Sequence, residues 1–455
     1  MHVLAVGLGV TGATVARHAS RQGWTCTVVE DDADAVARGA RRHEAEAAGA
    51  AVVVAPSPSE LADLVGAADL VVPSPGVALR HPVYDLAAAL GTPLLSEVEM
   101  AAAGASMPLI AVTGTNGKTT VTTMIAEILA ASGLSAVAAG NIGHPLLDAV
   151  AASPLPDVVV AEVSSFQLQF TVDFRPCVAV VLNVAPDHLD WHPSFDHYRD
   201  AKARIFANQR DRDVLVVNSA DPTTAAMAED APAGVARFAV DGGPGEYRVE
   251  DGSLITPDGS VIVEVGGLRR AHPHDLANGL AASAAALALP ASTGLDVTLR
   301  DARDALRAHR SLPHRLSLVG DAGGVRWYDD SKATNPSAAV AAVRGFESSV
   351  LLAGGRNKGL DLGLLREAAP RLRAVVAFGE AAPEVAAAFD GLVPVTTVGP
   401  MRDAVAAAQA LAEPGDAVLL SPGCASFDAY ADYSARGDDF AVEVQRVLSG
   451  EGSDG

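Results

Sequence analysis

Short apolar runs alternate with alanine-rich stretches along most of this chain, and this alternation restricts the possible folds more than any other feature. The runs "HVLAV", "PLIAV" and "SVLLA" begin at residues 2, 108 and 349. They are apolar over nearly their whole length, which is typical of parallel strands covered by helices on both faces. The alanine-rich stretches between such runs are long enough for helices, so the pattern predicts βα units. The sequence therefore predicts the α/β fold class.

The chain is expected to form three domains. Its 455 residues fit about three domains at roughly 150 residues each. The turn-rich stretches "AGASMP" and "HRSLPH" separate three blocks of strand and helix signals. We predict domains at residues 1–97, 98–311 and 312–455. Late in the central block, "EYRVEDGSLITPDGSVIVEVGG" predicts antiparallel hairpins through its Gly and Asp turns, and "HDLANGLAASAAALAL" predicts a helix.

The composition excludes several classes of protein. There are 33 basic and 55 acidic side chains and the net charge is −22, which opposes binding to nucleic acid or to an anionic membrane surface. No apolar run approaches the ~18 residues that a membrane-spanning helix needs, and the N-terminal residues predict a strand and loop rather than a signal peptide. Three scattered cysteines favour a reducing compartment. We expect a cytoplasmic protein with no nucleic acid partner and no membrane insertion.

The segment "AVTGTNGKTT" is the strongest single motif. An apolar strand runs into a glycine loop, and a helical stretch follows it. Backbone N–H groups of such a loop and the helix N-terminus favour phosphate, while Lys118 can reach the β- and γ-phosphates and the Thr119 hydroxyl can bind magnesium. Position 112 is valine where a strict Walker A motif has its first glycine. The alternative is a glycine turn that happens to contain a lysine.

A second glycine motif, "GLGVTG", spans Gly7 to Gly12 and also lies between a strand and a helix. It fits the dinucleotide-binding pattern, and Glu30 ends the next strand about where a ribose-binding carboxylate is expected. Three interpretations remain open from these residues: a dinucleotide site, a site for another nucleotide, or a tight turn without a ligand.

Titratable side chains follow several predicted strands. Glu162 lies at the end of the apolar run "DVVVAEV", and Asp187 and His188 follow "VAVVLNV". A buried carboxylate is costly unless it is paired or bound to metal, and ligands of parallel sheets gather outside the carboxyl ends of strands. We therefore expect the phosphate loop, Glu162 and His188 to converge on one sheet edge. Taken alone, His188 could equally be an ordinary surface histidine.

The third block has the same arrangement. Charged and hydroxyl side chains follow its strands in "YDDSKATNP" and "LLAGGRNKG", namely Asp330, Lys332, Thr334 and Lys358. Lysines at strand ends predict a surface that closes on an anionic substrate. The alternative is ordinary solvated charge in turns.

Lysine is rare in this chain. Only four of the 33 basic side chains are lysines. Lys118, Lys332 and Lys358 lie in the segments described above, whereas Lys202 lies in "YRDAKARIF", which has no phosphate-loop character. Lysine differs from arginine in having a primary amine that can lose its proton. Lys202 therefore requires a separate explanation.

Taken together, these segments resemble those of the Mur ligase family. The resemblance covers almost the whole chain, because "GNIG", "EVSSFQL", "NVAPDHLD", "LPHR" and "LLSPGCASFD" also occur in the family's order. It implies an N-terminal Rossmann-like domain that binds a UDP moiety, and a central P-loop ATPase domain with a mostly parallel sheet and a small antiparallel part. It also implies a C-terminal Rossmann-like domain that binds an amino acid. On this basis "GLGVTG" is expected to bind UDP rather than NAD.

The resemblance also implies roles for particular residues. Those implied for ATP binding are Gly114, Thr115, Asn116, Gly117, Lys118, Thr119, Thr120, Asn278, Arg315 and Asp330. Those implied for the UDP substrate are Gly9, Val10, Thr11, Ser74, Gly76, Asn141, Ser164 and Gln167. Those implied for the incoming amino acid are Lys332, Thr334, Lys358, Ser426, Phe427 and Tyr433. The implied catalytic residues are Lys118, Glu162, His188 and Lys202, and the implied metal ligands are Thr119, Glu162, His188 and Lys202.

The implied activity is ATP-dependent addition of D-glutamate to UDP-N-acetylmuramoyl-L-alanine through an acyl phosphate, in peptidoglycan precursor synthesis. The lysine in the family's YRxAK segment carries a carbamate, so Lys202 is expected to be a carbamylated ligand of the second of two magnesium ions. Arginine could not take this role, because carbamate formation needs a free primary amine. The expected partners are small molecules, and a monomer is expected.

Three other functions compete with this one. The first is a different amide ligase on the same scaffold, such as a diaminopimelate- or alanine-adding Mur ligase or a folylpolyglutamate synthase; "DSKATNP" stands where a diaminopimelate-adding enzyme would have a DNPR-type motif. The second is an NAD-dependent oxidoreductase, which would leave "TGTNGKTT" without a role. The third is a catalytically silent nucleotide-binding protein, which would be expected to lack at least one of the four catalytic residues.

Overall fold

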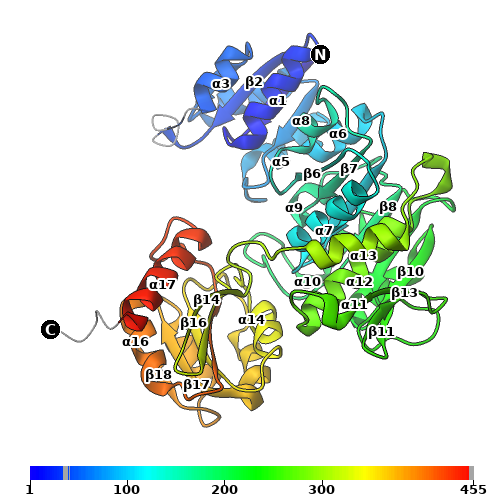
Figure 1. The fold of residues 1–455 in the computed structure, drawn as a ribbon. Helices are drawn as coiled ribbons and strands as arrows, with labels where there is room; N and C mark the ends of the chain where they lie inside the picture. Colours follow the sequence, from blue (N-terminus) through cyan, green and yellow to red (C-terminus); the bar gives the residue numbers. More distant parts are fainter. Residues whose placement is uncertain (34–38, 40, 450–455) are drawn as a thin grey trace. The chain divides into compact units, whose positions relative to one another are not determined.

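The computed structural model describes residues 1–33, 39 and 41–449, and it divides the chain into two compact units. The first unit comprises Met1–Val184, Trp191–Leu268 and Ala277–Ala308, and the second comprises Ala185–Asp190, Arg269–Leu276 and the chain from His309. Each unit has its own sheets and hydrophobic cores (Figure 1). Within the described part of the chain, no helix is both long and apolar enough to cross a membrane.

Four parallel strands form the N-terminal sheet of the first unit, in the order β3-β2-β1-β4. The strands are β1 (His2–Val6), β2 (Thr25–Glu30), β3 (Ala51–Val54) and β4 (Leu70–Pro73). The helices of this region are α1 (Val10–Arg21), α3 (Arg41–Ala47), α4 (Pro58–Ala67), α5 (Pro82–Leu90) and α6 (Glu97–Gly104).

A six-stranded parallel sheet forms the centre of the first unit, in the order β10-β9-β8-β5-β7-β6. Its strands are β5 (Leu109–Thr113), β6 (Ala136–Gly140), β7 (Val158–Glu162), β8 (Val178–Val181), β9 (Val214–Asn218) and β10 (Gly234–Phe238). The helices are α7 (Lys118–Ala131), α8 (Leu146–Val150), α9 (Ser165–Leu168), α10 (Phe195–Ala203), α11 (Pro222–Met227), α12 (Pro273–Leu287) and α13 (Leu299–Ala308).

The first unit also contains the predicted hairpins. Strands β11 (Arg248–Glu250), β12 (Ser253–Ile255) and β13 (Val261–Glu264) form a three-stranded antiparallel sheet. Helix α12 occupies the alanine-rich segment in which a helix was expected. The α/β class, the parallel central sheet and the small antiparallel part are therefore confirmed. The domain limits at residues 97 and 311 stay a prediction.

The second unit contains a six-stranded sheet in the order β14-β15-β19-β16-β17-β18. Figure 1 shows this sheet between α14 on one face and α16 with α17 on the other, and each face has its own hydrophobic core. The strands are β14 (Ser317–Ala322), β15 (Val325–Asp329), β16 (Ser349–Gly354), β17 (Leu372–Phe378), β18 (Val395–Thr397) and β19 (Ala417–Gly423). The helices are α14 (Pro336–Val343), the 3₁₀ segment η4 (Leu362–Arg371), α15 (Ala382–Ala388), α16 (Met401–Leu411) and α17 (Tyr433–Leu448).

The edge strand β14 was not predicted. It pairs antiparallel with β15, whereas the other strand pairs of this sheet are parallel. The turn between them consists of Gly323 and Gly324, whose φ angles are +63° and +79°. Two successive residues with positive φ allow the tight hairpin turn that matches the strand twist. The glycine pair between two strand-like segments is the sequence signal that could have revealed β14.

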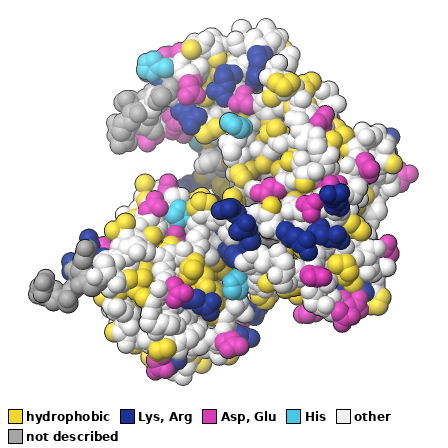
Figure 2. All heavy atoms as spheres, viewed as in Figure 1, with side chains coloured by type: hydrophobic (Ala, Val, Ile, Leu, Met, Phe, Trp, Pro, Cys, Tyr) yellow, Lys and Arg dark blue, Asp and Glu magenta, His cyan; other side chains and the backbone are white. Residues whose placement is uncertain are grey.

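Side chains of both charge signs are interspersed on the visible face of the protein (Figure 2). On this face the acidic side chains do not form a uniform negative surface, although the net charge of the chain is −22. Local anion-binding sites are compatible with such a distribution.

Helix α17 provides a test of the core that covers one face of the second unit's sheet. Phe440 is fully buried on this helix, with its ring centroid 6.4 Å from that of Trp327. Phe440→Ala is expected to lower the free energy of unfolding by about 3–5 kcal/mol, because it removes a buried aromatic side chain and leaves a cavity. Val442, on the same helix, is 57% exposed, and Val442→Ala is expected to change this free energy by less than about 0.5 kcal/mol. Denaturant unfolding followed by circular dichroism measures both, and equal losses would contradict the assignment of this core.

Candidate functional site

The predicted phosphate loop lies between β5 and α7, as expected. Gly114 has φ +156° and Gly117 has φ +85°. The positive φ of Gly117 favours glycine, and a Cβ atom there would lie 2.9 Å from Asn278 Oδ1, so that the Asn278 side chain would have to shift. The loop is followed by the 14-residue helix α7, whose first N–H groups have no partner within the helix. This arrangement is suited to phosphate binding.

Asn183, at the exit of the neighbouring strand β8, fixes the loop. The Thr115 N–H donates to the Asn183 carbonyl oxygen (2.9 Å), and the Asn116 N–H donates to Asn183 Oδ1 (2.8 Å). Asn183 Nδ2 donates in return to the Asn116 carbonyl oxygen (3.1 Å). Asn183 therefore ties the phosphate loop to the end of β8. The sequence did not predict this role for Asn183.

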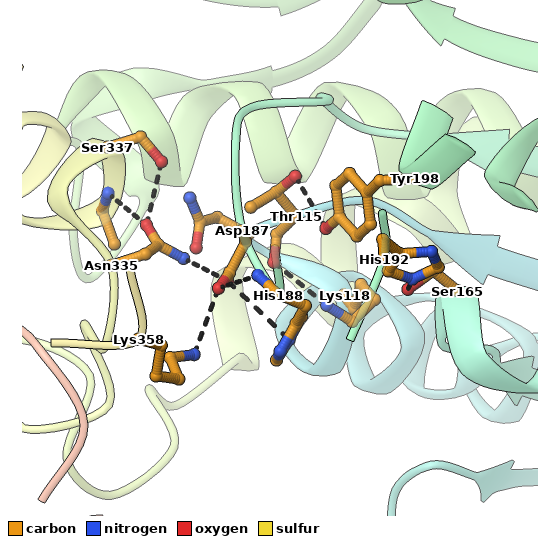
Figure 3. A network of polar contacts seen from close by, with 12 residues as sticks. Thr115, Lys118, Ser165, Asp187, His188, His192, Tyr198, Asn335, Ser337 and Lys358 are labelled. Atoms are coloured by element: carbon orange, nitrogen blue, oxygen red, sulfur yellow. Dashed lines mark hydrogen bonds and ion pairs between the residues drawn. The ribbon is translucent and has the colours of Figure 1, made fainter. Parts of the chain in front are cut away.

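Two of the four lysines meet at one carbonyl oxygen of the loop. Lys118 Nζ donates to the carbonyl oxygens of Gly114 (2.9 Å) and Thr115 (3.0 Å). Lys202, on α10, is only 1% exposed, and its Nζ donates to the Gly114 carbonyl oxygen at 2.8 Å. Its amine also lies 4.5 Å from the ring centroid of Tyr198, whose hydroxyl is 3.1 Å from Thr115 Oγ1 (Figure 3). The structure thus brings Lys202 to the phosphate loop, and it identifies Tyr198 as a contributor that the sequence did not reveal.

Glu162 lies next to this loop. It ends β7 and is the register partner of Val112 in β5, as expected for a residue at the same sheet edge. Its side chain is buried, and Oε1 accepts a hydrogen bond from Asn141 Nδ2 at 2.8 Å. Oε2 is buried and has no hydrogen-bond partner within the described part of the chain. A buried oxygen of this kind is costly unless a ligand or ion completes its environment.

His188 and its neighbour Asp187 belong to the second unit. The proximity of His188 to the phosphate loop and Glu162 therefore stays a prediction. Within the residues that the structure describes, no group of three or more His, Cys, Asp or Glu side chains is arranged to hold a metal ion.

The segment "GLGVTG" borders a pocket of about 720 Å³ in the first unit. Gly7 (φ +94°) and Ser74 approach closely, and Ser74 Oγ donates to the Gly7 carbonyl oxygen at 3.1 Å. Glu30 Oε2 accepts the Leu8 N–H at 2.7 Å, so this carboxylate supports the glycine loop itself. The pocket is lined by Gly9, Val10, Thr11, Ser74 and Gly76, which were expected to contact the UDP substrate, and by Asp31, Arg80 and His81 among others.

The other residues expected near the UDP substrate lie outside this pocket. Asn141 is bound to Glu162, as described above. Ser164 and Gln167 form a capping box at the start of α9, in which the Gln167 N–H donates to Ser164 Oγ and the Ser164 N–H donates to Gln167 Oε1. These local bonds account for their positions, and their contact with substrate stays a prediction.

In the second unit, the residues expected to bind the amino acid follow adjacent parallel strands. Lys332 follows β15, Lys358 follows β16 and Ser426 follows β19. Lys332 Nζ lies 3.8 Å from the ring centroid of Tyr433, a cation–π contact. Ser426 is buried, whereas Phe427 is 61% exposed. The backbone N–H of Thr334 donates to the Lys332 carbonyl oxygen (2.9 Å), so the loop after β15 is compact.

Asp187 also belongs to this group, although the sequence did not indicate it as a binding residue. Its carboxylate accepts hydrogen bonds from Lys358 Nζ (3.1 Å) and from Asn335 Nδ2 (3.0 Å) (Figure 3). Burial alone would raise the pKa of Asp187. The charges of His188 and Lys358, with the hydrogen bonds from Lys358 and Asn335, nevertheless hold this pKa below its ordinary value.

The residues outside the phosphate loop that were expected to bind ATP are divided between the units. Asn278 lies beside Gly117 in the first unit, whereas Arg315 and Asp330 lie in the second. Burial raises the pKa of Asp330 to about 7, although a hydrogen bond from Ser421 and the charge of Arg315 oppose this shift. Their common contact with one nucleotide stays a prediction.

The sequence matches known families along most of its length. Residues 1–96 match the model described as the Mur ligase MurD-like N-terminal domain, residues 112–286 match the Mur ligase middle domain, and residues 314–424 match the Mur ligase glutamate ligase domain. The chain is 43% identical to a UDP-N-acetylmuramoylalanine--D-glutamate ligase of Frankia casuarinae, with 97% of this chain and 93% of the relative covered. It is 40% identical to the protein of the same name from Streptomyces avermitilis, with 98% of each covered.

Solved structures agree on the fold. MurF from Acinetobacter baumannii has a TM-score of 0.61 at 21% identity, with 94% of this chain and 92% of that chain covered. The UDP-N-acetylmuramate-alanine ligase MurC from Thermotoga maritima has a TM-score of 0.59 at 20% identity, with 99% of this chain and 100% of that chain covered.

Two glycines at opposite ends of α7 provide a test of the phosphate loop. Gly117 and Gly133 have nearly the same φ, +85° and +87°, but a Cβ atom at Gly133 would have no atom within 4 Å. Both Gly117→Ala and Gly133→Ala are expected to cost about 1–2 kcal/mol of backbone strain. Only Gly117→Ala is expected to weaken ATP binding, because only there does the added Cβ atom come close to Asn278. The expected loss of ATP affinity is about tenfold, which corresponds to ~1.4 kcal/mol. Calorimetric titration with ATP separates the two, and equal ATP affinities would show that the loop does not bind the nucleotide.

Proposed function

The chain belongs to the Mur ligase family, and on this premise we propose that it is the ATP-dependent ligase that adds D-glutamate to UDP-N-acetylmuramoyl-L-alanine in peptidoglycan precursor synthesis. The choice of substrate rests on the names of the most similar relatives reported above. Relatives that are 37–43% identical over nearly the whole chain are named UDP-N-acetylmuramoylalanine--D-glutamate ligases. The match of the N-terminal residues to the MurD-like domain supports the same choice over other amide ligases of this scaffold. An oxidoreductase would leave the phosphate loop without a role.

The reaction needs activation of a carboxylate, which is a poor acylating agent in water. The alanyl carboxylate attacks the γ-phosphorus of ATP, ADP leaves, and an acyl phosphate results. The amine of D-glutamate then attacks the acyl carbon, and inorganic phosphate leaves as the amide bond forms. Both steps bring negatively charged groups together, so positioning and charge neutralisation are the main contributions of the protein.

The phosphate loop supplies the first part of this contribution. Its backbone is already fixed by Asn183, so little reorganisation is needed when ATP binds. Lys118 is held by two loop carbonyl oxygens and can turn toward a phosphate that carries more negative charge than a carbonyl group. Thr119 and Thr120 begin α7 directly after Lys118. We assign ATP binding to this loop, with Asn278 beside it and with Arg315 and Asp330 from the second unit.

The residues present fit magnesium. Glu162 offers a buried oxygen that lacks a hydrogen-bond partner in the described structure, and Thr119 offers a hydroxyl group close to the loop. Magnesium usually takes one or two protein oxygens together with water and phosphate oxygens, so a closed cage of protein ligands is not required. When bound, magnesium would neutralise phosphate charge and polarise the phosphoryl group. Glu162 and Thr119 would hold the first of two ions, and His188 and modified Lys202 the second.

Lys202 fits the carbamate hypothesis. Its amine is buried and donates to the Gly114 carbonyl oxygen. The ammonium group first loses a proton, and the free amine then adds to carbon dioxide with formation of an N–C bond and loss of a second proton, so that the product keeps one N–H group. That N–H could still donate to Gly114 while the new carboxylate oxygens bind metal. The modification would thus convert a buried cation into an anionic ligand without loss of this hydrogen bond.

The two other substrates have candidate sites. We assign the UDP moiety to the pocket bordered by Gly9, Val10, Thr11, Ser74 and Gly76, and the muramoyl part to Asn141, Ser164 and Gln167. We assign the amino acid to Lys332, Thr334, Lys358, Ser426, Phe427 and Tyr433. We further propose that the protein acts in the cytoplasm as a monomer, which its three free cysteines support for a reducing compartment.

The substrate assignment is tested by measuring phosphate release from ATP. Release is expected only when both UDP-N-acetylmuramoyl-L-alanine and D-glutamate are present, because the acyl phosphate needs both a carboxylate to form it and an amine to resolve it. L-Glutamate, L-alanine and diaminopimelate serve as controls. If one of these supports turnover equal to that with D-glutamate, the D-glutamate assignment is wrong.

The carbamate assignment is tested at Lys202. Lys202→Ala and Lys202→Arg are both expected to lower kcat at least about 100-fold, because neither side chain can supply the anionic metal ligand. A short-chain carboxylic acid is expected to restore part of the activity of Lys202→Ala by occupying the vacated position. Lys118→Ala is the control, since a cation is missing there and an acid cannot replace it. Near-normal turnover of Lys202→Arg would show that position 202 needs only a positive charge.

A further inference from the structure

A partly buried ion pair joins Lys358, one of the residues assigned to the amino acid, to the buried carboxylate of Asp187. Lys358 Nζ is 3.1 Å from Asp187 Oδ1, and the two side chains are 17% and 6% exposed. Both residues belong to the second unit. His188 Nε2 also lies 3.8 Å from the other oxygen of this carboxylate, Oδ2. Removal of Lys358 nevertheless takes away the nearer cationic partner of the buried carboxylate, which is costly. A ligand that takes Lys358 from Asp187 must therefore also satisfy the carboxylate.

The two oxygens of Asp187 have different partners. Oδ2 accepts from Asn335 Nδ2 at 3.0 Å. Asn335 is the N-cap of α14, because its Oδ1 accepts the Ala338 N–H (2.9 Å), and Oδ1 also accepts the Ser337 hydroxyl (2.8 Å). Oδ1 of Asp187 is held by Lys358 and by the backbone N–H of His188 (2.8 Å). Asn335 and the His188 N–H would keep the carboxylate in place if Lys358 moved.

The loop that carries Lys358 is fixed by backbone contacts. The Arg356 N–H donates to the Ala425 carbonyl oxygen (2.8 Å), and the Ala425 N–H donates to the Arg356 carbonyl oxygen (3.0 Å). Gly355, at φ +119°, allows this approach, because a Cβ atom there would lie 2.2 Å from the Ala425 oxygen. The loops of Lys358 and Ser426 are thus joined. Exchange of partners at Lys358 needs movement of its flexible side chain only.

We propose that Asp187 and Lys358 together form a receptor for the zwitterionic amino acid, with Asp187 as the residue that binds its ammonium group. A carboxylate of the amino acid takes the place of Asp187 at Lys358, and the ammonium group takes the place of Lys358 at Asp187. The inserted ligand brings one charge of each sign, so no buried charge is left unpaired. This inference rests on the proposed function and adds to it a specific basis for recognition of the amine.

An amine-free analogue distinguishes this proposal from simple carboxylate binding. Glutarate has both carboxylates of glutamate but lacks the ammonium group, so it would take Lys358 from Asp187 without supplying a cation in its place, and would add negative charge beside it. Dissociation constants of D-glutamate and glutarate are measured by calorimetry with a non-hydrolysable ATP analogue and UDP-N-acetylmuramoyl-L-alanine present. The ratio of the glutarate constant to the D-glutamate constant reports recognition of the amine and does not depend on turnover.

Asp187→Asn is expected to lower this ratio about tenfold or more, because a charge-assisted hydrogen bond to the ammonium group is lost while binding of carboxylate at Lys358 is kept or strengthened. Asn335→Ser is the second variant. Serine remains a good N-cap for α14 but is too short to replace the amide donor to Asp187, so the ratio is expected to fall in the same direction by a smaller factor.

Asp416→Asn is the matched control. Asp416 is a buried carboxylate of the same unit that pairs with Arg373 before β19, at the opposite end of the sheet from the Lys358 loop. Its replacement is expected to leave the ratio unchanged while causing a comparable loss of stability. An unchanged ratio in Asp187→Asn, or equal weakening of both ligands, would overturn the proposal.

Failure of the proposed function would be seen in the wild-type protein rather than in the variants. If the wild-type protein does not bind or turn over D-glutamate, the substrate assignment fails. The ratio is then measured with the amino acid that does support phosphate release and with its amine-free analogue. A ratio that again does not respond to Asp187→Asn rejects the zwitterion receptor for that amino acid as well.

Discussion

The orientation of parallel strands is the constraint on which both candidate sites depend. In the first unit, β5, β7 and β8 are neighbours that end at the same edge, so the phosphate loop, Glu162 and Asn183 must lie close together. In the second unit, β15, β19 and β16 end together in the same way and bring Lys332, Ser426 and Lys358 into adjacent loops. At such an edge the order of the strands is enough to bring these residues together, because the residues that follow neighbouring parallel strands lie at the same end of the sheet.

Buried charged side chains have two kinds of role in this structure, a structural one and a proposed ligand-binding one, and their hydrogen-bond partners distinguish the two. Arg436 is fully buried, and it donates to Ser331 Oγ, the Ser331 carbonyl oxygen and the Cys424 carbonyl oxygen. Burial lowers its pKa to about 10, but its neutral partners tie the loops after β15 and β19 together, so its role is structural. Glu162 differs because one of its oxygens lacks a partner in the described residues. A ligand or ion that bound this oxygen would offset the cost of burying it.

Local sequence patterns predicted the parts of the structure that depend on local physics. The apolar runs gave parallel strands, the Gly and Asp turns gave the hairpins of β11 to β13, and the glycine loop before α7 was located directly. Contacts between residues distant in the chain were not predictable in this way. Asn183 lies 67 positions from Asn116, and Asn335 lies 148 positions from Asp187. No periodicity or spacing relates such pairs, and a single asparagine or tyrosine has many possible roles until the fold selects one.

Lys118 and Lys358 donate to different kinds of acceptor, and this difference suggests that their two sites would select different ligands. Lys118 is bound to the neutral carbonyl oxygens of Gly114 and Thr115, and an arriving phosphate can replace them because it carries more charge and leaves only hydrogen-bonding groups behind. Lys358 is bound to the charged carboxylate of Asp187. An anion alone would draw Lys358 away and leave the buried carboxylate with only His188, whose Nε2 lies 3.8 Å from Oδ2, as a neighbouring cationic group among the described residues, which is costly. If the proposed sites are correct, the phosphate loop is therefore expected to accept any suitably placed phosphate, whereas the loop after β16 is expected to favour a ligand that carries an amine as well as a carboxylate.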